Sequence, residues 1–262
     1  MLTVISPAKT LDWSPAPVAA TPPLWPRDAA RLARTARGLT LRDLRGLMDI
    51  SDDLARLNRD RFRAFADDPA PDATRPAVFA FNGDTYLGFQ ARSLNPADLD
   101  HAQHHLRILS GLYGLLRPLD GIQPYRLEMG SRLHTRRGET LYDYWGDQIA
   151  LALHRDAAEV GTETLLNCAS QEYFAVARRP ALGLRVITPE FREVRGDKAQ
   201  IISFFAKRAR GAMARFVIVN RLTEAEAVKD FALDGYRYDP ARSQGDSWVF
   251  SRPYAGPSSL AS

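Results

Sequence analysis

Residues 200–221, with the sequence QIISFFAKRARGAMARFVIVNR, combine the two kinds of element that decide the fold. Residues 200–205 are mostly β-branched or aromatic, which predicts a short strand. From 206 to 221 the apolar residues recur at helical spacing, so this part is predicted as an amphipathic helix. A strand next to a long helix indicates a fold that mixes α and β elements.

The same reasoning extends from this stretch to both ends of the chain. Residues 2–5 are apolar and partly β-branched, and Ser6-Pro7 ends them, so they predict a strand that opens into a loop carrying Lys9. Further strands are predicted at 78–81, 165–169, 185–188 and 248–251, the last paired in a hairpin with 236–238. Helices are predicted at 27–37, 41–48, 51–65, 95 to about 109, and 141–154.

These elements predict an α+β fold in which helices wrap one mixed β-sheet, because strands are scattered among helices without a regular βαβ alternation. No repeat or composition break divides the 262 residues, so a single domain over 1–262 is expected. Five prolines within 15–26 predict an extended surface loop, and 255–262 is expected to be a flexible tail.

Composition excludes several classes of protein. No apolar run approaches the roughly 18 residues of a membrane span, and the N-terminus lacks the basic region of a signal peptide. The single cysteine, Cys168, cannot form an internal disulfide or a cysteine-based zinc site. His101, His104 and His105 lack an acidic or cysteine partner for a metal. We therefore expect a soluble cytoplasmic protein that uses no membrane, metal or cofactor.

Positive charge is concentrated in two segments, although the net charge of the chain is only +4. Residues 101–137 hold six arginines against two acids, and 201–221 hold five basic residues and no acid. Such asymmetry is typical of proteins that bind a phosphate-bearing partner. Solvated helix faces in an arginine-rich protein would give the same pattern, and this alternative stays open.

Three basic residues begin the helix predicted at 206–221, namely Lys207, Arg208 and Arg210. Cations at a helix N-terminus oppose the helix dipole, so they cost stability unless an anion compensates them. This conflict favours an anion-binding role over simple solvation.

Residues 109–114, LSGLYG, follow a predicted helix and are similar to the turn of a helix–hairpin–helix. In that motif glycines let the backbone donate N–H groups to a DNA phosphate. Gly111 and Gly114 are three residues apart rather than the usual two, and Arg107 and Arg117 flank them. A glycine helix cap followed by a tight turn would explain the segment equally well.

The chain uses lysine rarely, with four lysines among its 35 basic residues. Unlike arginine, a lysine can lose its proton and then act as a base or a nucleophile. Lys198 follows a turn and Lys229 lies in an acidic run, whereas Lys9 and Lys207 have no such context. Lys9-Thr10 is not a P-loop, because no glycine precedes it.

Several blocks of sequence, in this order, resemble the YaaA (peroxide stress resistance) family. They are SPAKTL (6–11), NGDTY (82–86), HLRILSGLYG (105–114), RPLD (117–120), PYRLEMG (124–130), YWG (144–146), ASQEYF (169–174) and SFFAKRARG (203–211). The resemblance implies a cytoplasmic bacterial protein of the hydrogen peroxide response that limits oxidative damage to DNA. It also implies a family-specific fold with a basic cleft and a helix–hairpin–helix, which binds double-stranded DNA and DNA with unpaired or branched regions without evident sequence preference.

We therefore expect a DNA-binding site built from the basic segments and the predicted hairpin. Its residues are Lys9, Arg107, Ser110, Gly111, Tyr113, Gly114, Arg117, Arg126, Arg132, Lys207, Arg208 and Arg210. The alternative is an enzyme, lyase-like or glycosylase-like, that acts on nucleotides or damaged DNA. Its candidate catalytic residues are Lys9, Asp84, Glu128 and Lys207, because a lysine can form a Schiff base and a carboxylate can move protons.

Overall fold

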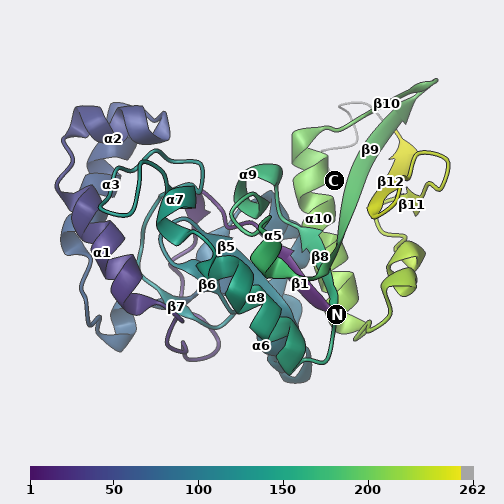
Figure 1. Cartoon of the computed structure of the whole chain (residues 1–262), viewed down its shortest axis with the longest axis horizontal. Helices are drawn as coiled ribbons and strands as arrows, with labels where there is room; N and C mark the ends of the chain where they lie inside the picture. Colours follow the sequence, from purple (N-terminus) through teal and green to yellow (C-terminus); the bar gives the residue numbers. More distant parts are fainter. Residues whose placement is uncertain (255–262) are drawn as a thin grey trace.

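An eight-stranded sheet runs through the computed structural model, which describes residues 1–254 (Figure 1). The strands along the sheet are β11 (Arg237–Tyr238), β12 (Ser247–Pro253), β9 (Arg185–Arg195), β8 (Thr164–Cys168), β1 (Leu2–Ile5), β5 (Leu106–Ser110) and β6 (Gly114–Leu116), and β10 (Lys198–Gln200) pairs with β9. The five strands from β12 to β5 are parallel, and the other three add antiparallel hairpins.

The central strand β1 shows why the sequence forms a parallel sheet here. Leu2, Val4 and Ile5 are fully buried, and so is Thr3 between them, which fits a strand that is covered on both faces of the sheet. Its register joins Thr3 to Leu106 of β5 on one side, while β8 pairs on the other.

The order of the strands creates a switch point beside β1. From β1 the chain reaches β5 on one side, and later returns to β8 on the other side of β1. In sheets of this kind ligands bind outside the carboxyl ends of the strands at such a point. We therefore expect a ligand site in the segments that follow β1 and β8.

Three consecutive helices form one end of the molecule: α1 (Pro26–Arg37), α2 (Leu41–Met48) and α3 (Asp52–Ala64), at the left of Figure 1. The Thr40 side chain accepts from the Asp43 N–H in a capping box, and Ser51 caps α3 in the same way at Leu54. α6 (Pro96–His105) and α8 (Gln148–Glu159) pack beside β5 and β6.

The long helix α10 (Ser203–Val219) packs on β1, β8 and β9 and against α5 (Asp84–Phe89). Gly88 and Gly211 make the close approach of the two helices possible. A Cβ on Gly88 would overlap the Arg208 carbonyl oxygen, and one on Gly211 would overlap that of Thr85. The blocks 82–86 and 203–211 are thereby held together.

Short elements complete the described chain. They are β2 (Thr10–Leu11) paired with β4 (Phe81–Asn82), β3 (Arg75–Pro76) paired with β7 (Gly121–Ile122), the helices α4 (Ala77–Ala80), α7 (Leu141–Trp145) and α9 (Gln171–Phe174), and the 3₁₀ turns η1 (Pro71–Ala73), η2 (Ala91–Ser93), η3 (Pro180–Leu182) and η4 (Ala225–Asp230). None of the helices within 1–254 has the length and apolar character to cross a bilayer.

The predicted mixed sheet with surrounding helices is confirmed, as are the strands at 2–5, 165–169 and 248–251, the hairpin with 236–238 and the three helices of the first end. The strand at 185–188 is also confirmed, but β9 continues to Arg195. Residues 15–25 form no helix or strand, as the prolines predict, and the expected tail 255–262 lies outside the described residues.

Four predicted elements are wrong in type or extent. Residues 77–80 form the buried helical turn α4 instead of a strand, and α10 begins at Ser203, inside the predicted strand 200–205. The helix expected to reach about 109 ends at His105, where β5 takes over. Gly146, with φ of 49°, separates α7 from α8 in the helix predicted at 141–154.

The predicted helix–hairpin–helix at 109–114 is also wrong. This segment is the turn between the antiparallel strands β5 and β6, so no helix enters or leaves it. The glycines and the apolar residues around them serve the β-hairpin instead.

Candidate functional site at the carboxyl edge of the sheet

The loops after β1 and β8 meet at the switch point and are tied together by hydrogen bonds. The Ser170 N–H donates to Ser6 Oγ over 2.9 Å, and the Tyr86 hydroxyl donates to the Ser6 carbonyl over 3.2 Å. Three sequence blocks that are far apart along the chain, 6–11, 82–86 and 169–174, therefore converge at this edge.

The loop that carries Lys9 is held by its neighbours on both sides. Thr10 in β2 pairs with Asn82 in β4, and a Cβ on Gly83 would come within 3.1 Å of the Ala8 Cβ. The backbone next to Lys9 is thus fixed, while the Lys9 side chain itself is 66% exposed.

Glu128 forms the centre of the site. The residue is only 9% exposed. Its Oε1 accepts from Arg126 Nε over 2.9 Å and lies 3.6 Å from Lys9 Nζ. The other oxygen, Oε2, is buried and has no hydrogen-bond partner among residues 1–254. A buried carboxylate oxygen without a partner is costly, so it marks a position where a ligand, a proton or a water can act.

A small cavity, bordered by Pro7, Tyr125 and Tyr173, lies next to Lys9, Arg126 and Glu128. Its volume is about 10 Å³, which is room for about one water molecule. Burial raises the pKa of both tyrosines well above the ordinary value, so both remain neutral phenols. The unpartnered Oε2 of Glu128 thus shares this cavity with the Lys9 amine and two neutral phenols.

Two further acidic residues have different surroundings. Glu172, in α9, accepts from the Gly130 N–H through Oε1 over 3.1 Å and so ties α9 to the segment after Glu128. Asp84, a catalytic candidate from the sequence, lies in the first turn of α5, and no ion pair joins it to Lys9 in the described part of the chain.

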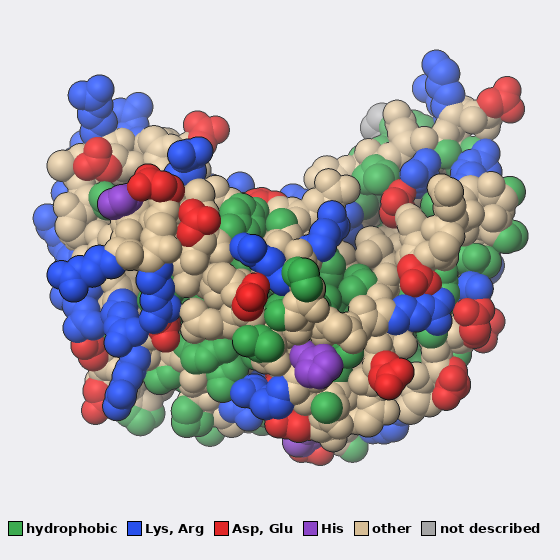
Figure 2. All heavy atoms as spheres, viewed as in Figure 1, with side chains coloured by type: hydrophobic (Ala, Val, Ile, Leu, Met, Phe, Trp, Pro, Cys, Tyr) green, Lys and Arg blue, Asp and Glu red, His purple; other side chains and the backbone are tan. Residues whose placement is uncertain are grey.

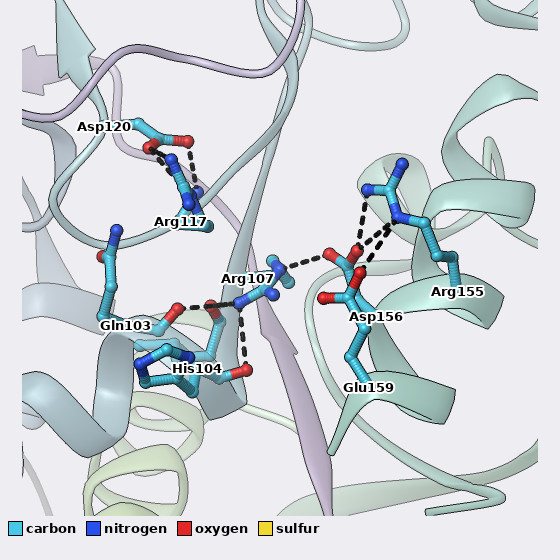
Figure 3. Close-up of polar contacts among 9 residues, drawn as sticks. Gln103, His104, Arg107, Arg117, Asp120, Arg155, Asp156 and Glu159 are labelled. Carbon is cyan, nitrogen blue, oxygen red and sulfur yellow. Dashed lines mark hydrogen bonds and ion pairs between the residues drawn. The ribbon is translucent and has the colours of Figure 1, made fainter. Parts of the chain in front are cut away.

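Arg107 and Arg117, which the sequence places at a DNA-binding hairpin, instead hold the fold together on another part of the molecule (Figure 3). Arg107 is 5% exposed and its Nε donates to Asp156 Oδ2 over 2.6 Å. Arg117 Nε donates over 3.0 Å to Asp120, which is fully buried. These two guanidinium groups are neutralised by carboxylates, and that of Arg107 is also out of reach of a phosphate.

The four hairpin residues expected to contact DNA, Ser110, Gly111, Tyr113 and Gly114, are also buried. Ser110 Oγ accepts from the Tyr113 N–H over 2.9 Å, and a Cβ on Gly111 would overlap the Leu127 carbonyl. Gly114 has φ of 72° and faces Trp145. The residues of this turn are thus enclosed by protein.

The basic start of α10 is partly exposed. Lys207 and Arg208 are exposed, and Arg208 Nε lies 3.7 Å from Asp234 Oδ2 in an open ion pair. Arg210 is half-buried, and its burial lowers its pKa. Burial also raises the pKa of the nearby Cys168 to about 12, so that cysteine is an unreactive thiol.

The molecule has a hollow face between two raised ends (Figure 2). We define it by its borders: α2, α7 and the segment 130–137 on one side, α9 in the middle, and the first turns of α10 with the β9–β10 hairpin on the other (Figure 1). Lys and Arg side chains stand at both raised ends and on its floor, mixed with acidic ones (Figure 2).

Arg132 is the predicted residue on the α2 side of this face. It is exposed and borders a cavity of about 620 Å³ shared with Arg42 of α2 and with His134. Arg42 was missed by the sequence reasoning, which singled out only charge-rich segments. Ser6 and Ser170 were missed as well, although their positions directly after predicted strands could have indicated them.

Helices joined by a short turn do occur, but at α2 and α3 rather than at the predicted place. The turn is Asp49-Ile50-Ser51, in which Asp49 has φ of 49° and Ser51 caps α3. The sequence signal was present in Thr40 and Ser51, two capping residues that precede helical segments eleven positions apart.

These features define a mixed α/β protein with a polar crevice at the carboxyl edge of a mostly parallel sheet, beneath a hollow face with basic borders. Within 1–254 no group of three or more His, Cys, Asp or Glu is placed to hold a metal ion. The sequence comparisons then give the family. The chain belongs to the family described as peroxide stress protein YaaA, whose model matches residues 1–242.

Relatives named UPF0246 proteins match over nearly the whole chain. One from Ruegeria pomeroyi is 61% identical over 256 residues, covering 98% of this chain and 100% of the relative. One from Roseobacter denitrificans is 61% identical, covering 97% and 99%, and one from Jannaschia sp. is 55% identical, covering 97% and 98%. The family resemblance predicted from the sequence blocks is confirmed.

Proposed function

We propose that the protein binds double-stranded DNA, and DNA with unpaired or branched regions, through the hollow face, and that it does so in the bacterial cytoplasm during the response to hydrogen peroxide. The observation that carries this proposal is the position of exposed cations from distant segments on opposite borders of one concave surface. Arg42 of α2 and Arg132 of the segment 130–137 are exposed on one bordering segment, and Lys207 and Arg208 are exposed in the second turn of α10, the helix that forms the other border.

The proposed set of DNA-contacting residues is smaller than the set that positive charge alone suggests. Arg107, Arg117 and Arg126 each donate to a carboxylate, and the hairpin at 109–114 is enclosed. A mixed surface of this kind supports contacts to the backbone of DNA without reading its sequence, because phosphate contacts carry no sequence information directly.

Two features suit the surface to phosphates. The first is the pair of exposed cations Lys207 and Arg208, which lie one turn after the start of α10 at Ser203, where the positive end of the helix dipole adds to their field. The second is the exposed Arg42 of α2 on the opposite border; the turn that joins α2 to α3 contributes no backbone donors there, because the Asp49 and Ile50 N–H groups both donate to the Arg45 carbonyl.

Salt dependence of binding to a duplex tests the proposal. If Arg42, Arg132, Lys207 and Arg208 each neutralise one phosphate, log K should fall against log salt with a slope of about −3.6. Lys207→Gln should make the slope shallower by about 0.9 and weaken all sequences alike. The matched control is Lys229→Gln, since Lys229 pairs with Glu226 in η4, outside the hollow face.

Fluorescence anisotropy with blunt, bubbled and branched duplexes gives the required constants. Equal slopes for the wild type and Lys207→Gln, or binding that does not depend on salt, would remove the hollow face as the DNA-binding surface.

A further inference from the structure

Lys9 and Glu128 form an arrangement that phosphate binding does not require. A buried carboxylate at the floor of a phosphate site would repel the ligand, yet Glu128 lies 3.6 Å from the Lys9 amine and is almost completely buried. An amine beside a carboxylate that has one free oxygen is instead the arrangement used for covalent chemistry at a carbonyl carbon, with the carboxylate moving protons.

The two side chains differ in their access to solvent in a way that suits this chemistry. Lys9 is 66% exposed, so its amine can reach a group on a molecule lying in the hollow face. Glu128 is enclosed, and Arg126 donates to the same Oε1 that Lys9 approaches. Because Arg126 already balances the charge of Glu128, the Lys9 amine is free to leave the ion pair and react.

The second candidate lysine, Lys207, lacks these features. It is exposed on α10, and no ion pair joins it to a carboxylate among residues 1–254. Arginine cannot replace Lys9 in such a step, because its guanidinium keeps its proton.

We propose that Lys9 and Glu128 form a catalytic pair that opens DNA at an abasic site, with the ring-opened deoxyribose aldehyde as the reacting group. This proposal rests on the proposed function in one respect, since DNA binding brings the abasic sugar to the hollow face. The cavity beside Oε2 holds about one water, so the sugar stays on the exposed side of Lys9 and only a water or a proton enters.

The reaction balances without an oxidant or a reductant. Lys9 passes one ammonium proton to Glu128, and its amine adds to the C1′ carbon of the aldehyde. Glu128 returns that proton to the C1′ oxygen, which leaves as water to give a protonated imine. Glu128 takes a proton from C2′ through the one water that its cavity can hold, a C2′–C3′ double bond forms, and the bond from C3′ to the 3′ phosphate oxygen breaks with its electron pair on the phosphate. Glu128 then releases the proton to solvent. A water then hydrolyses the imine, which releases the unsaturated aldehyde and restores the lysine.

Borohydride trapping tests the proposal, because it reduces the imine to a stable amine. The first probe is a duplex with one abasic site, and the second is 2-deoxyribose 5-phosphate, which needs no DNA-binding surface. The wild type should give an adduct with both probes, and peptide mass spectrometry should place it on Lys9. Lys9→Arg should lose the adduct while keeping the positive charge, and the control Lys229→Arg should keep it.

Glu128→Gln separates imine formation from elimination. Without the carboxylate, strand cleavage should slow by about 100-fold while imine still accumulates, so the ratio of trapped protein to cleaved DNA should rise. Circular dichroism melting curves show whether each variant is folded.

The results distinguish this inference from the proposed function. If intact duplex binds but neither probe is trapped, the catalytic pair is wrong and DNA binding stands. If deoxyribose phosphate is trapped on Lys9 but duplexes do not bind, the pair stands and the DNA-binding surface is wrong. An adduct that survives in Lys9→Arg overturns the assignment of Lys9.

Discussion

Replacing Arg107 by alanine tests whether this arginine supports the fold, as its contacts indicate, rather than contacting DNA. Its Nε donates to Asp156 Oδ2 over 2.6 Å, and its Nη1 donates to three backbone carbonyls within residues 103–106. Arg107 is 5% exposed, and so is Asp156. The substitution therefore leaves a buried carboxylate and several carbonyls without their donor.

The expected cost follows from these contacts. Removing one partner of a buried ion pair destabilises a protein by about 3–5 kcal/mol. Arg155 still reaches Asp156 Oδ1 over 2.8 Å, which partly compensates the charge, so the lower end of this range applies. We expect the free energy of unfolding to fall by about 3 kcal/mol and Tm by about 6–12 °C.

Urea unfolding followed by circular dichroism measures this change. Arg34→Ala is the control, because Arg34 and Asp67 form an exposed pair whose loss should cost less than about 1 kcal/mol. The double variant Arg107→Met with Asp156→Leu should recover most of the loss, since apolar residues often replace a buried pair without penalty. A loss below about 1 kcal/mol for Arg107→Ala would refute the structural role.

Three further predictions concern other buried groups. Gly211→Ala should lower the free energy of unfolding by about 1–3 kcal/mol in urea, because the new Cβ overlaps the Thr85 carbonyl and pushes α5 away from α10. A variant as stable as the wild type would contradict that packing. Cys168 should not react with a thiol reagent in the native protein near pH 8 and should react after unfolding, since burial raises its pKa to about 12; rapid native labelling would contradict its burial. Burial, with His105 nearby, lowers the pKa of His101 to about 4, so between about pH 6.5 and 4 the unfolded chain binds more protons than the folded one and stability should fall as the pH drops. His101→Gln should weaken this dependence of Tm on pH, and an unchanged dependence would contradict it.

The sequence predicted the elements whose signals are local. Three of the four residues 2–5 are apolar because β1 is covered on both faces, and α2 and α3 begin after capping residues, Thr40 and Ser51. The elements that were predicted wrongly depend on contacts with distant parts of the chain. Nothing local breaks the helix at His105, and β5 forms because residues 106–108 pair with β1.

The candidate site was predictable in its residues but not in their roles. Lys9 and Glu128 were both chosen from chemistry, yet their proximity depends on a fold that joins segments more than a hundred residues apart. Arg107 was chosen from charge, and its partner Asp156 lies 49 residues further along the chain. Local charge cannot distinguish an exposed arginine from a buried and neutralised one, so Arg107 was counted among the exposed cations.

Hydrogen–deuterium exchange with and without a duplex carrying one abasic site tests the central claim most directly, because it locates the surface without any substitution. We expect slower exchange in the segments that border or line the hollow face, namely 6–11, 41–52, 130–137, 169–174 and 203–211. Protection confined to η4 and β11, or no protection at saturating DNA, would contradict it.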